Sequence, residues 1–293
     1  MNSVTRLSGK RCVVTGGTSG IGLVTARKLV EMGGDILIVG RDANRGLAAK
    51  RSIHEATGRE GADFLQADLS DMDAVRSLAE SISSRWDYVD VLINNAGGMF
   101  GKRQLSAQGF EMTFALNHLS YFLLTALLMP RLLAASEKAR IVNVASEAHR
   151  RMRLDFDDLQ SEKSYNRLLA YGRSKLANLL FTHELAQRIN PQQVTVNALH
   201  PGFVATDIGT RHGLMPSFAW WLAKFAALSP EKGAATSVYL ASSPDVADAN
   251  GLYFYKCKPI KPSQEALDSD AARCLWEIST RLTGIDWGGG QFS

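Results

Sequence analysis

The pair of residues best suited to chemistry is Tyr171 and Lys175, in a segment Ala-Tyr-Gly-Arg-Ser-Lys-Leu-Ala-Asn that is typical of a helix start. Residues four apart share a helix face, so the phenol and the ammonium are expected to point the same way. A nearby positive charge favours the phenolate and lowers the phenol pKa from about 10. Tyr171 would then be a usable acid or base at an alcohol or a carbonyl. The alternative is a surface pair that adds little to helix stability.

Two more polar residues stand where they could serve the same reaction. Ser146 follows the predicted strand 140–144, and open α/β sheets bind ligands at the carboxyl ends of their strands. Its hydroxyl could donate to a substrate oxygen. Asn117 lies in an otherwise apolar helix predicted over 110–133. It would be either a structural amide or the holder of a water that passes protons to Lys175.

A glycine-rich turn follows the first predicted strand, Arg11–Thr15, and leads into a helix predicted over 21–32. The turn reads Thr15-Gly16-Gly17-Thr18-Ser19-Gly20-Ile21-Gly22. Glycines there permit a tight turn, let backbone N–H groups approach a pyrophosphate, and aim the positive helix end at it. Such turns also occur without a ligand, but the position between strand and helix favours a dinucleotide site.

The end of the second predicted strand, 35–39, indicates which dinucleotide would bind. A carboxylate there would bind the ribose 2′-hydroxyl of NAD, whereas an arginine suits the 2′-phosphate of NADP. The sequence has Gly40 at the position of the acid and Arg41 directly after it. A guanidinium can pair with phosphate through two hydrogen bonds. We therefore predict NADP(H), the alternative being a solvated arginine that pairs with Asp42.

Two further strand ends are expected near the cofactor. Asp68 and Leu69 follow the third predicted strand, Ala62–Gln66, and Asp68 would either contact the adenine or cap the next helix. The fourth predicted strand, 89–94, ends in Asn94-Asn95-Ala96-Gly97. That sequence forms a good turn and also suits a backbone that passes close to a cofactor.

These motifs are connected by short β-branched runs that alternate with longer amphipathic segments. The alternation is typical of a parallel sheet covered by helices on both faces. The predicted strands are Arg11–Thr15, 35–39, Ala62–Gln66, 89–94, 140–144, Val194–Leu199 and 251–254. The predicted helices are 21–32, 44–57, 71–84, 110–133, 170–189, 231–242 and 270–283. With no repeat or linker, we predict one domain over 1–293, a doubly wound sheet of about seven strands, and a flexible tail over 285–293.

Composition excludes several classes of protein. The chain has 293 residues, 45% hydrophobic and 21% charged, with a net charge of +4. These values exclude disorder and a nucleic-acid-binding surface. Three widely spaced cysteines suggest neither a metal site nor a disulfide framework, and they suit a reducing cytoplasm. The N-terminus lacks a signal peptide, and the longest apolar run ends at Pro130, short of the ~18 residues of a membrane span. We predict a cytoplasmic protein, and peripheral membrane contact is left open.

The order of these motifs resembles the short-chain dehydrogenase/reductase family over essentially the whole chain. The resemblance rests on the G-x-x-x-G-x-G turn, Asn-Asn-Ala-Gly, and the set Asn117, Ser146, Tyr171 and Lys175. It implies a single-domain Rossmann-type fold and an oxidoreductase. Ser146 would polarise a carbonyl, Tyr171 would exchange the proton, and Asn117 would support a proton relay. Lys175 would bind the nicotinamide ribose and lower the pKa of Tyr171.

The segment His200-Pro201-Gly202-Phe203-Val204-Ala205-Thr206 resembles the family sequence Pro-Gly-x-Val-x-Thr. The resemblance implies that its backbone and threonine hold the nicotinamide carboxamide. The implied cofactor contacts are Thr15, Gly16, Thr18, Ser19, Gly20, Ile21, Gly22, Arg41, Asp68, Leu69, Asn95, Ala96, Gly97, Tyr171, Lys175, Pro201, Gly202, Val204 and Thr206.

Within the family, Asn117-His118-Leu119, the segments 143–149 and 229–234, and the long gap between Ser146 and Tyr171 resemble the retinol dehydrogenase-like branch. Membrane-bound members of that branch carry an N-terminal hydrophobic anchor, and we expect none here because residues 1–10 contain no apolar run. A run of large apolar residues over 206–228 predicts a substrate lid for a bulky lipophilic molecule. The large side chains of that run include Phe218, Trp220 and Trp221. A core helix or a membrane-contact patch is the alternative for this run.

We therefore predict an NADPH-dependent oxidoreductase that acts on a lipophilic ketone, aldehyde or secondary alcohol, chiefly by reduction. One alternative is a catalytically silent NADP(H)-sensing protein, which would typically lack the tyrosine or the lysine. A retinol or retinal dehydrogenase proper is another. A third alternative is an enzyme of the same fold that catalyses sugar epimerisation or dehydration. Such relatives usually have a different glycine spacing and a larger C-terminal domain, and neither feature is seen in this sequence. The helices 110–133 and 170–189 would either form a homodimer face or lie on the core.

Overall fold

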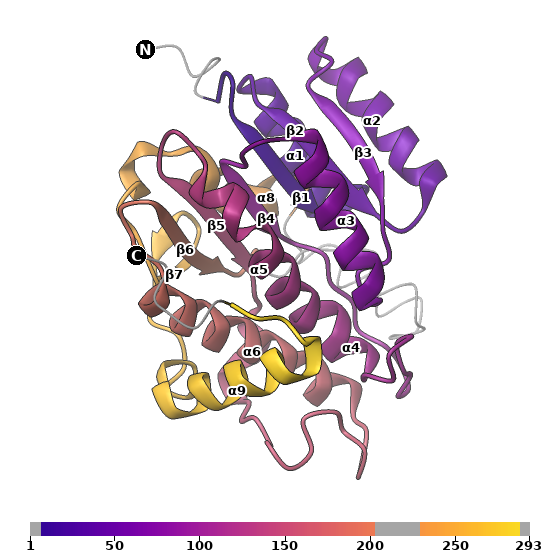
Figure 1. Cartoon of the computed structure of the whole chain (residues 1–293), viewed down its shortest axis with the longest axis vertical. Coiled ribbons are helices and arrows are strands. Elements are labelled where there is room, and N and C mark those ends of the chain that lie inside the picture. Colours follow the sequence, from indigo (N-terminus) through magenta and orange to yellow (C-terminus); the bar gives the residue numbers. More distant parts are fainter. Residues whose placement is uncertain (1–6, 203–228, 288–293) are drawn as a thin grey trace.

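The computed structural model describes residues 7–202 and 229–287 and places them around one eight-stranded sheet (Figure 1). The strands are β1 (Arg11–Thr15), β2 (Asp35–Gly40), β3 (Ala62–Gln66), β4 (Val91–Asn94), β5 (Ala139–Val144), β6 (Val194–Leu199), β7 (Tyr253–Tyr255) and β8 (Lys258–Pro259). Their order is β3-β2-β1-β4-β5-β6-β7-β8, and only β8 runs antiparallel to its neighbour. The predicted doubly wound α/β fold is therefore confirmed, with one short strand more than expected.

The strand order reverses beside β1, which pairs with β2 on one side and β4 on the other. At such a switch point the connections leave in opposite directions and open a crevice at the carboxyl ends of the strands. The central strands are buried on both faces, and all six residues of β6 are buried. Their continuous Val, Leu and Ile content suits this position.

Two layers of helices cover the sheet (Figure 1). One hydrophobic core joins the sheet to α1 (Gly20–Glu31), α2 (Ala43–Thr57) and α8 (Pro230–Ser242). The other joins it to α3 (Met72–Arg85), α5 (Ser120–Leu133) and α6 (Arg167–Arg188), with α9 (Ser269–Thr283) outside α6. Each functional turn is thus fixed between a buried strand and a packed helix.

Helix α6 begins at Arg167, three residues before its predicted start. The reason is the Asn166 side chain, which accepts hydrogen bonds from the backbone N–H groups of Leu168 and Leu169. Such a cap stabilises a helix start by about 1 kcal/mol. Tyr171 consequently lies within the second turn of a well-anchored helix rather than at a frayed end.

The single helix predicted over 110–133 is divided into three parts. These are α4 (Met112–Phe114), a π-helical turn over Ala115–Leu119, and α5. Pro130, which ends the longest apolar run of the sequence, lies inside α5, as the predicted helix 110–133 requires. It falls in the last turn, where a missing N–H costs one hydrogen bond, and the buried faces of α5 keep the helix intact.

The stretch Met112–Leu133 is, among the described residues, the one helix whose length and apolar composition would let it cross a membrane. Of its apolar window, 78% is buried inside the protein. Packing in the core of the domain therefore accounts for its composition.

The C-terminal region closes over α5 and α6. Trp287 is 9% exposed, and its ring centroid lies 4.5 Å from that of Trp276 and 5.2 Å from that of Phe122. The first residues of the segment predicted as a flexible tail, 285–293, are thus held by aromatic packing. Helices α5 and α6 lie on the core, with α9 against α6.

Residues 203–228 lie outside the described part of the chain. The predicted lid over 206–228 and the predicted cofactor contacts Val204 and Thr206 fall there, and they stay predictions.

Candidate active site

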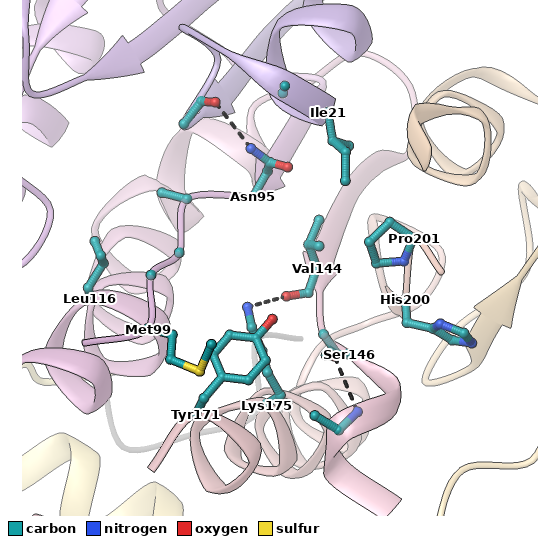
Figure 2. Close-up of a pocket in the computed structure, with 18 of the residues that line it drawn as sticks. Ile21, Asn95, Met99, Leu116, Val144, Ser146, Tyr171, Lys175, His200 and Pro201 are labelled. Atoms are coloured by element: carbon teal, nitrogen blue, oxygen red, sulfur yellow. Dashed lines mark hydrogen bonds between the residues drawn. The ribbon is translucent and has the colours of Figure 1, made fainter. Parts of the chain in front are cut away.

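A cavity of about 1550 Å³ opens at the carboxyl ends of the central strands. Seventeen of the predicted site residues line it, from the glycine turn at one end to Ser146, Tyr171 and Lys175 at the other. Figure 2 shows this meeting of segments, with Asn95 and Ile21 on one side and Tyr171 and Lys175 on the other. Thr15 and Asn117 do not line the cavity, because their side chains are buried behind it.

The glycine turn leaves no room for side chains. A Cβ atom on Gly22 would lie 2.2 Å from the carbonyl oxygen of Gly16 and 2.5 Å from Nδ2 of Asn95. Gly16 itself has φ +66°, a left-handed conformation that favours glycine. Ser19 at the N-cap of α1 forms no side-chain capping bond, so the helix start keeps backbone N–H groups for an anion. The turn therefore fits a pyrophosphate.

Thr15 ties this turn to the neighbouring strand end. Its Oγ1 accepts hydrogen bonds from the backbone N–H groups of Asn95 (2.9 Å) and Ala96 (3.0 Å). Nδ2 of Asn95 donates to the carbonyl oxygen of Thr15 at 2.8 Å. The prediction that Thr15 contacts the cofactor is corrected: its hydroxyl is turned inward and positions the Asn95–Ala96 backbone.

Arg41 and Asp68 line the cavity beside the glycine turn. Asp42, the alternative partner of Arg41, caps α2 by accepting from the backbone N–H of Arg45 at 3.0 Å. Asp68 was expected either to contact the adenine or to cap the next helix, and Asp71 is the residue that caps α3. Oδ1 of Asp68 accepts from the backbone N–H and the hydroxyl of Ser70 at 3.0 and 2.7 Å, and the contacts of Arg41 and Asp68 with a cofactor stay predictions.

Lys175 and Tyr171 come together at the other end of the cavity. Nζ of Lys175 donates to the carbonyl oxygen of Val144 at 2.9 Å and lies 5.8 Å from the centroid of the Tyr171 ring. Burial lowers the pKa of Lys175 to about 7. Burial also raises the pKa of Tyr171, and the hydrogen bond with Ser146 opposes that rise.

This result corrects the expectation that Lys175 lowers the pKa of Tyr171. The spacing of four residues does place both side chains on one helix face, but the ammonium points to a backbone carbonyl beneath the ring. Desolvation of the phenol then dominates its pKa.

Asn117 lies in the π-helical turn, a distortion that is frequent at functional sites. Its Nδ2 donates to the carbonyl oxygen of Gly98 and to Oγ of Ser174, both at 2.9 Å. Its Oδ1 accepts from the backbone N–H of Gly98 at 2.8 Å. Because both amide hydrogens are used by protein groups, the side chain positions the Gly97–Gly98 backbone rather than donating to a water.

Several functional candidates escaped the sequence reasoning. Tyr121 donates to the carbonyl oxygen of Ala96 at 2.7 Å, and its ring centroid lies 5.6 Å from Nζ of Lys175. Its place one helical turn after Asn117 was the only available signal. An apolar wall is formed by Met99, Phe100, Met112, Leu116, Leu168 and Ile260, and three basic residues, Arg150, Arg167 and Lys261, also line the cavity.

Comparisons with known proteins agree with this geometry. The sequence profile of the family described as short chain dehydrogenase matches residues 10–215. Human retinol dehydrogenase 13 is 41% identical over 290 residues, which cover 96% of this chain and 86% of that protein. Human retinol dehydrogenase 11 is 40% identical over 283 residues, which cover 97% of this chain and 88% of that protein.

Solved structures share the fold. A Mycobacterium paratuberculosis protein has a TM-score of 0.79 and 32% identity, and the match covers 97% of both chains. A short chain dehydrogenase from Shigella flexneri 2a, complexed with NADP, has a TM-score of 0.66 and 21% identity, covering 87% of this chain and all of that one. The chain therefore belongs to the short-chain dehydrogenase family, whose members are oxidoreductases that use a nicotinamide cofactor.

Proposed function

We propose that this protein is an NADPH-dependent reductase of bulky, lipophilic ketones or aldehydes, which also oxidises the corresponding alcohols. One observation carries the proposal: a single cavity joins a phosphate-binding turn, the Ser146–Tyr171–Lys175 set and an apolar wall. A nicotinamide bound there would supply the hydride for the carbonyl carbon. The protein has to orient the carbonyl, provide a proton and exclude water.

Ser146 orients the carbonyl oxygen. Its Oγ accepts a hydrogen bond from the backbone N–H of Ala148 at 3.2 Å, as Figure 2 shows. The Ser146 hydroxyl also hydrogen-bonds the Tyr171 phenol, and its hydrogen would be donated to a carbonyl oxygen bound beside that phenol. Polarisation of the carbonyl by a fixed donor stabilises the negative charge that develops on the oxygen.

Tyr171 supplies the proton in the direction of reduction. Burial raises the pKa of its phenol, so the protonated form is present at neutral pH. The phenol would give its proton to the alkoxide oxygen that forms on the substrate. Reduction needs the protonated phenol at the outset, whereas oxidation of an alcohol needs the phenolate.

The choice of NADPH is supported by Arg41, which lines the cavity together with Gly40 and Thr18. A Cβ at Gly40 would lie 2.7 Å from Cγ2 of Thr18, so a carboxylate side chain, as NAD would need there, does not fit this position without rearrangement. The NADP complex of the related Shigella flexneri dehydrogenase adds support.

The substrate class is supported by the apolar wall, which includes Met99, Phe100 and Leu168. Retinal is a specific second candidate, because retinol dehydrogenases 11 and 13 are about 40% identical to this chain. Retinal and the other bulky ketones or aldehydes are all lipophilic carbonyl compounds, and the apolar wall suits any of them.

The test is a panel of carbonyl substrates: all-trans-retinal, a long-chain aliphatic aldehyde, a bulky aromatic ketone and acetaldehyde, each assayed with NADPH and with NADH. We expect NADPH oxidation with the large lipophilic members and little with acetaldehyde. A preference for retinal over the other large substrates would select the second candidate. No NADPH-dependent reduction of any member would contradict the proposal.

A further inference from the structure

His200 follows directly after β6 and is 6% exposed, at the wall of the cavity. Its Nδ1 accepts a hydrogen bond from the backbone N–H of Gly202 at 3.3 Å, and its Nε2 lies 3.3 Å from Oε2 of Glu147. An imidazole that accepts at Nδ1 carries its proton on Nε2. That proton faces the Glu147 carboxylate, so both contacts specify the same neutral tautomer.

The ring of His200 is held in place from the side. It stacks on Tyr255 with the ring centroids 4.2 Å apart and the planes 14° from parallel. Tyr253 lies on the same strand, with its centroid 5.6 Å from that of His200. The ring orientation is therefore fixed, with Nδ1 facing Gly202 and Nε2 facing Glu147.

Each partner of His200 belongs to a different wall of the reacting end. Glu147 directly follows Ser146 and starts a 3-10 helix over Glu147–Arg151. Gly202 has φ +81° and lines the cavity together with Pro201. Figure 2 shows Pro201 and His200 beyond Val144 and Ser146, on the side opposite Tyr171.

We propose that Glu147 and His200 form a positioning pair, in which His200 fixes the Pro201–Gly202 backbone against the nicotinamide and Glu147 ties that backbone to the Ser146 loop. The proposal rests on the proposed function, which places the nicotinamide at this end of the cavity. The pair contacts neither the reacting carbon nor the transferred proton. It acts through the alignment of the cofactor with Ser146.

The pair also makes cofactor binding sensitive to acid. Uptake of a second proton turns Nδ1 of His200 into a donor, which cannot accept from the Gly202 N–H. The charged or titratable groups facing His200 are Glu147, His149 and Arg150 on the 3-10 helix, and Tyr253 and Tyr255 on β7. Burial lowers the pKa of His200, His149 and Arg150 lower it further, and Glu147 raises it.

The first test compares His200→Asn with His200→Gln. The shorter amide reaches the position of Nδ1 and can still accept from Gly202, whereas the longer one reaches towards Glu147 and leaves Gly202 without an acceptor. We expect His200→Gln to weaken NADPH binding about fivefold to tenfold, as for the loss of one hydrogen bond. His200→Asn should restore most of that affinity. Thermal unfolding of both variants checks that they are folded.

The control ligand is 2′,5′-ADP, which carries the adenosine half and its phosphates but no nicotinamide. Its affinity should be the same in His200→Gln as in the unaltered protein, because the pair touches only the nicotinamide end. Equal losses for NADPH and 2′,5′-ADP would overturn the proposal, as would unchanged NADPH binding in His200→Gln. Failure of the unaltered protein to bind either ligand would instead contradict the proposed function.

The second test is the acid limb of kcat/KM for NADPH in Glu147→Gln. An amide still accepts from Nε2 but no longer raises the pKa of His200 by its charge. The acid limb should therefore move to lower pH in Glu147→Gln and disappear in His200→Asn. An acid limb that stays in place in both variants would overturn the proposal.

Discussion

The two ends of the cavity differ in what lines them: mainly backbone at the glycine turn, and mainly side chains around Tyr171. At the proposed cofactor end, the backbone leaves no room for side chains, as at Gly16 and Gly22. At the proposed reacting end, the cavity is lined by buried side chains whose pKa values are shifted, as for Tyr171 and Lys175. The difference teaches that a steric site can be recognised from spacing alone, whereas a chemical site also requires knowledge of burial.

The largest effect is expected for Tyr171→Phe, which should separate the two ends. Removal of the phenolic oxygen takes away the proton donor and should lower kcat by about 10²–10⁴-fold. The dissociation constant of NADPH, measured by fluorescence titration, should change little because the cofactor end is untouched. Retention of full activity would show that the proton comes from another group.

Arg41→Ala should give the next largest effect, confined to the cofactor end. Loss of a charge-assisted contact to the 2′-phosphate costs about 1.5–3 kcal/mol, or roughly 10–100-fold in the ratio of kcat/KM for NADPH to that for NADH. Activity with NADH provides the internal control. The ratio for Arg41→Lys should lie between those of the unaltered protein and Arg41→Ala, because lysine keeps the charge but lacks the planar fork of the guanidinium. An unchanged ratio in Arg41→Ala would rule out this assignment.

Gly22→Ala tests the steric character of the cofactor end. The added methyl group would lie 2.2 Å from the Gly16 carbonyl oxygen, and overpacking of this kind costs about 1–3 kcal/mol. We expect NADPH affinity to fall about tenfold or more. Gly58→Ala is the control, because Gly58 lies outside the cavity and has open space around it, and only its left-handed φ of +65° disfavours alanine. It should lower stability and leave NADPH affinity unchanged.

Lys175→Met should give the smallest effect, an increase in stability of the cofactor-free protein. Burial lowers the pKa of Lys175 from 10.5 to about 7, so the unfolded chain binds more protons between those values. The lysine therefore destabilises the native state most below pH 7, and this cost disappears as the pH approaches 10.5. The midpoint of thermal unfolding should rise more at pH 6 than at pH 9, by about 2–4 °C per kcal/mol. An equal rise at both pH values would contradict the shifted pKa.

Most strands could be predicted within two residues, because buried β-branched runs bounded by turn residues have few alternatives. The π-helical turn at Asn117 could not, since one extra residue in a turn does not alter the apolar pattern enough to be seen. The two-residue strand β8 is too short to carry a pattern.

The candidate site divides in the same way. Residue type and spacing predicted that the glycine turn, Arg41 and the tyrosine–lysine pair belong to one site, and the structure brings them to one cavity. The inward orientation of Thr15, the raised pKa of Tyr171 and the contact between His200 and Glu147 could not, because each depends on partners far apart in the sequence. Long-range contacts and burial are properties of the folded chain.

The most direct measurement of the central claim follows the hydride itself. The protein is incubated with a reducible lipophilic carbonyl and NADPH that carries two deuterium atoms at C4 of the nicotinamide, and the product is examined by mass spectrometry. We expect an alcohol with a single deuterium on the former carbonyl carbon, and almost none of this product with Tyr171→Phe. An alcohol without deuterium, or labelled alcohol in equal amounts from both proteins, would contradict the central claim.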